Sequence, residues 1–148
     1  MNKGTVIIMS DAEGKILWQL RDTNPEAPIS FPGYWNLPSG GQELADGGDI
    51  QKTAARELEE ETGYKANPGE FIVLFTSVQE NPVKGPIERY IVHINYDGKQ
   101  PIRCFEGEKM EFHSLEEMKT QQNVFQDHVV FTSKYVESQV PNHKERKG

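Results

Sequence analysis

The stretch Gly40–Tyr64 reads GGQELADGGDIQKTAARELEEETGY, and its second half has the pattern of an amphipathic helix. Every fourth residue from Ile50 to Leu58 is apolar, which would place an apolar stripe on one side of a helix. Asp49 is a favourable N-cap residue, and Gly63 suits the position just past a helix end. The stretch therefore predicts a helix over Ile50–Thr62 that packs on a core through one face.

Three glutamates share a second face of this predicted helix. Successive helical residues turn by about 100°, so Glu60 and Glu61 would lie about 60° and 40° to either side of Glu57. Glu59 points to the other side. Like charges at these spacings oppose helix formation, and the apolar stripe does not require them. One interpretation is a solvated acidic face; the glycine-rich turn before the helix and the glycine after it favour carboxylates presented to a phosphate-binding cleft.

The carboxylates also predict which ion would lie between them. Hard oxygen ligands suit Mg²⁺ or Mn²⁺. The segment has no cluster of Cys or His, so zinc is not favoured.

The segment resembles the Nudix box, G-x5-E-x7-R-E-U-x-E-E-x-G-U, in which U is a bulky apolar residue. Residues 56–63 match the second half of the pattern, and Tyr64 fills its last position. The residues Trp35–Gly41 resemble the W-x-L-P-G-G lead-in. Gln19–Asp22 and Phe105–Glu108 also resemble segments of the family.

The first half of the box departs from the family pattern. Counting back seven residues from Arg56 places Gly48 where the family has Glu. We therefore expect Asp49 to replace this carboxylate in part, near Arg56, as well as to cap the helix. Gly40 or Gly41 can fill the leading glycine position only if the loop has one or two extra residues.

The resemblance implies an α+β fold, a Nudix-like αβα sandwich with a mixed sheet and the Nudix helix packed on it. It also implies Mg²⁺ or Mn²⁺ as the cofactor. The metal ligands would be Glu57, Glu60 and Glu61. The catalytic candidates are Glu57, Glu60 and Glu106, and which of them acts as the general base stays open.

Other residues have structural or substrate-binding assignments. Arg56 would orient the loop or a carboxylate, although it fits a simple surface pair with Glu60 as well. Arg21 fits either a phosphate contact or a charge at a strand edge. Glu108 is a second candidate for a later-loop carboxylate. The structural residues are Arg56, Asp49, Gly40, Gly41 and Gly63, and the substrate-binding residues are Arg21, Phe31, Tyr34 and Glu108.

The rest of the chain predicts further strands and helices. Cys104 is expected in the core, within one of these strands. The predicted strands are Thr5–Met9, Ile16–Leu20, Trp35–Leu37, Phe71–Val78, Tyr90–Tyr96, Pro101–Phe105 and Lys109–His113. A short helix is expected to begin at Ser114 with a capping box, and a last helix over Val124–Ser138.

Length and charge bound the class of protein. The 148 residues fit a single domain over 1–140, followed by a flexible polar tail over 141–148. A formal net charge of -7 makes nucleic acid an unfavourable partner. One cysteine excludes a disulfide within the chain, and no apolar run suits a signal peptide or a membrane span. We expect a cytoplasmic protein, and a homodimer is compatible with the sequence.

The expected partner is a small nucleotide-like substrate. The favoured reaction is hydrolysis of a phosphoanhydride bond in a (deoxy)nucleoside triphosphate, including an oxidised one. A hydrolase of ADP-ribose or of a nucleoside diphosphate sugar is the alternative within the same class. A catalytically silent nucleotide-binding domain is an alternative of another class.

Overall fold

The central strand β1 (Asn2–Ser10) contributes side chains to two hydrophobic clusters, one on each face of the sheet. Its side chains alternate between the two faces of the sheet. Val6 and Ile8 belong to one buried cluster, whereas Ile7 and Met9 belong to the other. All four are fully buried, so β1 is covered on both faces.

The computed structural model describes residues 2–26, 29, 31–83 and 85–139, so the predicted tail over 141–148 lies outside the described residues. The remaining strands are β2 (Ile16–Leu20), β3 (Trp35–Asn36), β4 (Ser39–Gly41), β5 (Ile72–Asn81), β6 (Gly85–Asn95) and β7 (Lys109–His113). The helices are α1 (Ile50–Thr62), α2 (Leu115–Lys119) and α3 (Gln126–Gln139), with single 3₁₀ turns η1 (Leu44–Asp46) and η2 (Pro68–Glu70).

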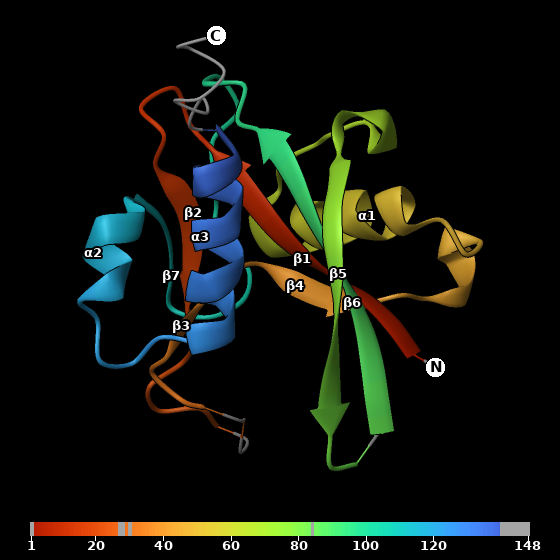
Figure 1. The fold of residues 1–148 in the computed structure, drawn as a ribbon, viewed down its shortest axis with the longest axis horizontal. Helices are drawn as coiled ribbons and strands as arrows, with labels where there is room; N and C mark the ends of the chain where they lie inside the picture. Colours follow the sequence, from red (N-terminus) through yellow and green to blue (C-terminus); the bar gives the residue numbers. More distant parts are fainter. Residues whose placement is uncertain (1, 27–28, 30, 84, 140–148) are drawn as a thin grey trace, which may run out of the picture.

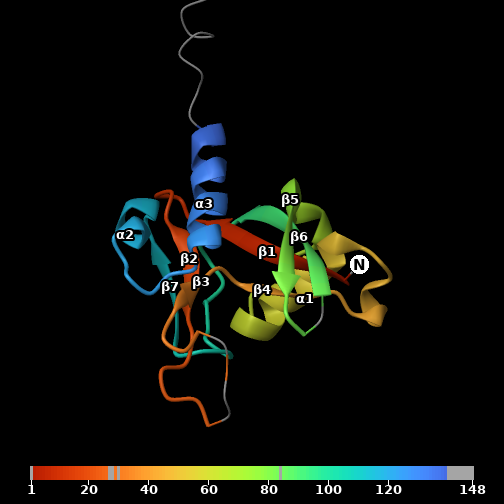
Figure 2. The same ribbon diagram turned by 60° about the horizontal axis from the view of Figure 1, so that its bottom comes forward.

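The strands form a mixed sheet in the order β3-β2-β1-β6-β5, with β4 paired to β1 and β7 paired to β2. The β1–β6 pair is parallel, and the other pairs are antiparallel. The helix α1 covers one face of the sheet, and α2 and α3 lie on the other (Figures 1 and 2). The predicted αβα sandwich with a mixed sheet is therefore confirmed.

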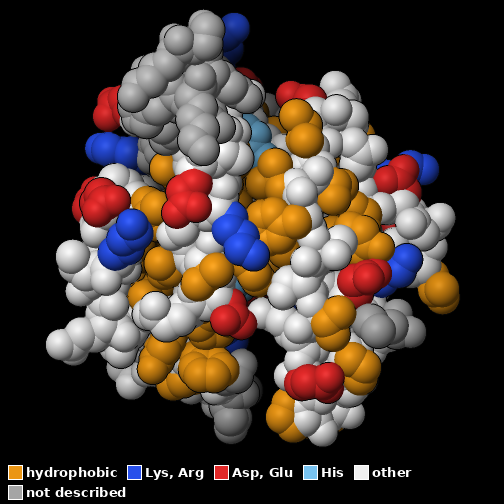
Figure 3. All heavy atoms as spheres, viewed as in Figure 1, with side chains coloured by type: hydrophobic (Ala, Val, Ile, Leu, Met, Phe, Trp, Pro, Cys, Tyr) orange, Lys and Arg blue, Asp and Glu red, His pale blue; other side chains and the backbone are white. Residues whose placement is uncertain are grey.

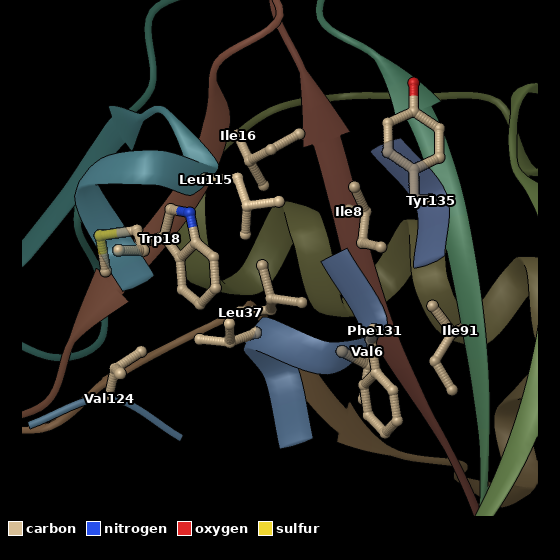
Figure 4. Close-up of a cluster of buried hydrophobic side chains, with 12 residues drawn as sticks. Val6, Ile8, Ile16, Trp18, Leu37, Ile91, Leu115, Val124, Phe131 and Tyr135 are labelled. Atoms are coloured by element: carbon tan, nitrogen blue, oxygen red, sulfur yellow. The ribbon is translucent and has the colours of Figure 1, made fainter. Parts of the chain in front are cut away.

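Each helix layer is held by one of the two apolar clusters. Ala54 and Leu58 of the predicted stripe are fully buried against the α1 face of the sheet. On the opposite face, Phe131 and Tyr135 of α3 pack with Trp18 and the inward side chains of β1 (Figure 4). None of the helices in the described residues is long and apolar enough to cross a membrane.

The predicted strand over Pro101–Phe105 is wrong, and so is the core position of Cys104. The backbone N–H of Arg103 donates to Thr62 O, and that of Phe105 donates to Glu61 O, both at 2.9 Å. The segment thus satisfies carbonyls in the last turn of α1 rather than pairing in the sheet. Cys104 is consequently exposed.

Candidate active site

Both ends of α1 are fixed by the residues that flank it. The Asp49 carboxylate accepts hydrogen bonds from Gln51 N at 2.9 Å and Lys52 N at 3.3 Å, so the predicted N-cap is confirmed. Gly63 follows the helix at φ 76°, a conformation that favours glycine, and its N–H donates to Glu59 O at 2.8 Å. These ends set which side chains of α1 face the β4 strand.

Arg56 joins α1 to the loop before it. Its Nε lies 3.0 Å from Asp46 Oδ1, and its Nη2 lies 3.0 Å from Asp46 Oδ2. Nη2 also donates to Gly41 O at 2.8 Å. Asp46 is 3% exposed, and its hydrogen bonds with Arg56 lower its pKa to about 2. This two-bond pair fixes the loop against the helix.

The expectation that Asp49 lies near Arg56 as the replacement carboxylate is wrong, because its carboxylate caps backbone N–H groups. Asp46, which sequence reasoning missed, takes that place. The signal was present, since Gly40-x5-Asp46 has the spacing of the box. Nine residues separate Asp46 from Arg56 instead of seven, and the extra length falls after Asp46, where Gly47 and Gly48 both have positive φ.

Glu57 lies against Gly40 of β4. Its side chain is 13% exposed and accepts a hydrogen bond from Arg56 Nη1 at 2.9 Å. A Cβ at Gly40 would overlap the Glu57 carboxyl group, so only glycine leaves room for it. Burial raises the pKa of Glu57, and Arg56 opposes this rise.

Glu61 is the most buried of the three predicted ligands. It is 3% exposed, and its Oε2 has no hydrogen-bond donor. Burial, together with the nearby carboxylates of Glu106 and Glu57, raises the pKa of Glu61 to about 9. The fold therefore brings Glu106, an exposed residue of a later loop, to the α1 carboxylates.

Glu60 lies at the exposed edge of this group. Its side chain is 58% exposed, and its Oε2 lies 3.2 Å from Arg56 Nη1, the same atom that binds Glu57. The carboxylates of Glu57 and Glu60 both point to Arg56. In the described part of the chain, no three His, Cys, Asp or Glu side chains are arranged so that they could hold a metal ion together.

The chemistry of these residues nevertheless fits a divalent cation. Glu61 Oε2 is a buried acceptor without a donor, and carboxylates that repel one another surround it. An all-carboxylate set suits Mg²⁺ or Mn²⁺ better than zinc. A cation here would compete with Arg56 for Glu57 and Glu60.

A cleft of about 1000 Å³ lies between the β5–β6 hairpin and α3. Figure 3 shows the hollow at the lower edge of the molecule. Phe31, Tyr34 and Phe125 line it, with the Phe31 ring centroid 5.3 Å from that of Tyr34 and 4.9 Å from that of Phe125. Phe31 is 54% exposed and has a φ of 52°, which is unusual for a residue other than glycine.

Two further predicted substrate residues have different placements. Arg21 lines the same cleft as Phe31 and Tyr34. Glu108 is not among the residues that line the cleft, and it instead accepts hydrogen bonds from Thr23 N, at 2.8 Å, and Thr23 Oγ1. These bonds lower the pKa of Glu108. Its position holds the loop after β2 and does not support a substrate contact.

Arg89 of β6 also lines the cleft, and sequence reasoning missed it. It is half-buried and borders a second cavity of about 640 Å³, which Lys3, Gly40, Gly41 and Gln42 also line. Burial lowers the pKa of Arg89, and the Glu57 carboxylate opposes this change. Arg89 lies one residue before the strand predicted at Tyr90–Tyr96, and no sequence motif around it indicates a functional role.

The chain matches the NUDIX domain family model over residues 2–135, and it belongs to the Nudix family. A Nudix hydrolase of Pseudomonas aeruginosa is 37% identical over 65 residues, which is 44% of this chain and 36% of that protein, so the match spans about a third of the relative's length.

Solved structures of the same fold cover nearly the whole chain. The MutT protein from Methanosarcina mazei matches with a TM-score of 0.74 at 18% identity, over 95% of this chain and 96% of that one. The NUDIX domain of Shewanella oneidensis NrtR, in complex with ADP ribose, matches with a TM-score of 0.72 at 17% identity, over 93% and 88% of the two chains. At these identities the likeness concerns the fold alone.

Proposed function

We propose that this protein hydrolyses a phosphoanhydride bond of a nucleotide in a reaction that depends on Mg²⁺ or Mn²⁺. The observation that carries the proposal is the carboxylate group of Glu57, Glu61 and Glu106, in which Glu61 has a buried oxygen without a donor. The aromatic cleft and the carboxylates meet at β4, because Ser39 lines the cleft and its neighbour Gly40 contacts Glu57.

Glu57, Glu60 and Glu61 would hold the ion. When bound, the ion supplies neutralisation of the negative charge on the phosphate oxygens and lowers the pKa of a nearby water. Arg56 would position Glu57 and Glu60, and Asp46 would hold Arg56 in turn. The aromatic rings of Phe31 and Tyr34 would stack on the base of the nucleotide.

The chemical step is an attack of water on phosphorus with cleavage of the anhydride P–O bond. A carboxylate accepts the proton of the water, and the leaving phosphate or nucleotide departs with the bridging oxygen. Glu57, Glu60 and Glu106 are the candidates for the base. The exposure of Glu106 and its position beside Glu61 and Glu57 favour it for this role.

A (deoxy)nucleoside triphosphate, including an oxidised one, is the first substrate candidate, because its base would occupy the aromatic cleft. The second cavity favours another candidate, a nucleoside diphosphate joined to a further group such as a sugar. This cavity borders Gly40 and provides polar groups from Lys3 and Gln42. ADP-ribose is such a molecule.

The test is a panel of nucleotides assayed in Mg²⁺ and in EDTA. The panel contains the common deoxynucleoside triphosphates, an oxidised deoxyguanosine triphosphate, ADP-ribose and a nucleoside diphosphate sugar. We expect metal-dependent release of phosphate, pyrophosphate or a nucleoside monophosphate from at least one of them. Binding without turnover across the panel would contradict the proposal and identify a silent nucleotide-binding domain.

A further inference from the structure

Arg89 is a half-buried cation that forms no salt bridge with a carboxylate in the part of the chain that the structure describes. Its Nε donates to Gln79 Oε1 at 3.3 Å and its Nη1 to Gly40 O at 3.4 Å, and both acceptors are neutral and distant. None of the ion pairs among the described residues includes Arg89. Arg56, by contrast, pairs with several carboxylates. The Glu57 carboxylate acts on Arg89 only from beyond salt-bridge distance, so the burial of the guanidinium is incompletely compensated, and an external anion would compensate it further.

The backbone around Arg89 leaves space for its guanidinium group. Gly4 of β1 pairs in register with Arg89 of β6. A Cβ on Gly4 would lie 2.5 Å from Arg89 Nη1 and 2.7 Å from Gly40 O. A glycine at this position therefore keeps the guanidinium beside β4.

The position of Arg89 joins the two cavities to the carboxylate group. Arg89, Ser39 and Ile87 line both the aromatic cleft and the second cavity. Gly40 accepts a hydrogen bond from Arg89 through its carbonyl oxygen, and its Cα faces the Glu57 carboxylate. A nucleotide with its base in the cleft and its phosphates near Glu57 would pass Arg89.

We propose that Arg89 binds a phosphate group of the substrate at this junction and selects phosphorylated ligands over the free nucleoside. This inference rests on the proposed function for the identity of the ligand. A guanidinium group can donate two parallel hydrogen bonds to phosphate oxygens, which its present neutral acceptors do not require.

The experiment compares ligand pairs that differ only in their phosphates. The probes are α,β-methylene ADP against adenosine and α,β-methylene GDP against guanosine, measured by calorimetry in Mg²⁺. The methylene bridge prevents hydrolysis, so binding is read without turnover. In the wild-type protein we expect at least one diphosphate to bind more tightly than its nucleoside.

Arg89→Gln should weaken binding of that diphosphate by about 10- to 100-fold and leave nucleoside binding within about twofold, because one charge-assisted contact is lost. Arg89→Lys should recover part of the loss. Arg103→Gln is the matched control, because this exposed arginine lies outside the linings of both cavities. An equal loss for diphosphate and nucleoside, or no loss, would overturn the inference.

Thermal stability gives a second readout. Arg89 forms no salt bridge in the described residues and only two long hydrogen bonds to neutral acceptors, so Arg89→Gln should keep or raise the melting temperature. A fall of several degrees would assign Arg89 to structure instead. The two proposals can be distinguished. If no nucleotide is hydrolysed but Arg89→Gln abolishes the preference for the diphosphate, the hydrolysis proposal is wrong and the inference about Arg89 is supported.

Discussion

Among single residues, Arg56 organises the candidate site. Its Nη1 atom holds Glu57 and Glu60, while its Nε and Nη2 hold Asp46. Asp46 also accepts hydrogen bonds from Glu43 N at 2.8 Å and Thr53 Oγ1 at 2.9 Å. The buried Asp46 carboxylate therefore connects the loop before α1 to α1 itself.

Asp46→Asn should lower the free energy of unfolding by about 1–3 kcal/mol, because a buried acceptor of charge-assisted bonds loses its charge. Glu43→Gln is the matched control. Glu43 also pairs with Arg56, at 2.9 Å, but its side chain is 57% exposed, so the change should cost less than about 1 kcal/mol. Urea unfolding at neutral pH measures both. Equal effects of the two variants would show that the burial of Asp46 adds nothing.

Among the elements, α1 shows what the sequence could predict. Its bounds, its N-cap and its buried stripe follow from local periodicity and capping, and the structure confirms all three. Ile16–Leu20 and Lys109–His113 are likewise confirmed as strands. These predictions succeeded because each depends on contacts near in sequence or on simple alternation.

The failures concern segments whose structure depends on distant partners. Pro101–Phe105 resembles a strand in sequence, but the N–H groups of Arg103 and Phe105 donate to α1 carbonyls about forty residues earlier in the chain. Asp46 and Arg89 matter because of where the fold brings them, Asp46 to Arg56 and Arg89 to Gly40. The spacing from Gly40 does indicate Asp46, whereas the sequence around Arg89 carries no sign of its contact.

Asp49→Ala should cost about 1 kcal/mol of stability, because two N–H groups of the first turn of α1 lose their acceptor. Asp49→Asn should cost much less, since asparagine is an equally good N-cap residue. Thermal or urea unfolding compares the two variants. If alanine is tolerated as well as asparagine, the side-chain cap does not stabilise α1.

In the whole molecule, a buried histidine joins the α3 layer to the connection between β3 and β4. His128 is 3% exposed, and its Nδ1 accepts a hydrogen bond from Leu37 N at 3.0 Å. Burial lowers the pKa of His128 to about 3, and the charge of Arg89 contributes. The neutral imidazole is therefore the form that the fold requires.

This burial predicts a pH dependence of stability. An unfolded histidine takes up a proton near pH 6.5, whereas native His128 does not. The contribution to stability is present above pH 6.5 and is lost as the pH falls from there towards 3. His128→Asn keeps an acceptor for Leu37 N but cannot be protonated. Between pH 6 and 5, the free energy of unfolding of this variant should fall less steeply than that of the wild type, with slopes that differ by up to about 1.4 kcal/mol per pH unit. Urea unfolding at several pH values measures both slopes, and equal slopes for the two proteins would contradict this prediction.

We propose that the carboxylates on one side of α1 perform metal-dependent hydrolysis. Glu60 and Glu59 are adjacent and both exposed, but only Glu60 lies on the side of Arg56 and Glu57. The most direct test measures Mg²⁺-dependent turnover of the best nucleotide, together with a thermal melt, for wild type, Glu60→Gln and Glu59→Gln.

We predict that Glu60→Gln reduces turnover by about 10²-fold or more, because charge that holds the ion and stabilises the transition state is lost. Its melting temperature should stay unchanged or rise slightly, since repulsion with Glu57 is relieved. Glu59→Gln should retain wild-type turnover. A stable Glu60→Gln protein with near-normal turnover would contradict the account and remove α1 as the catalytic element.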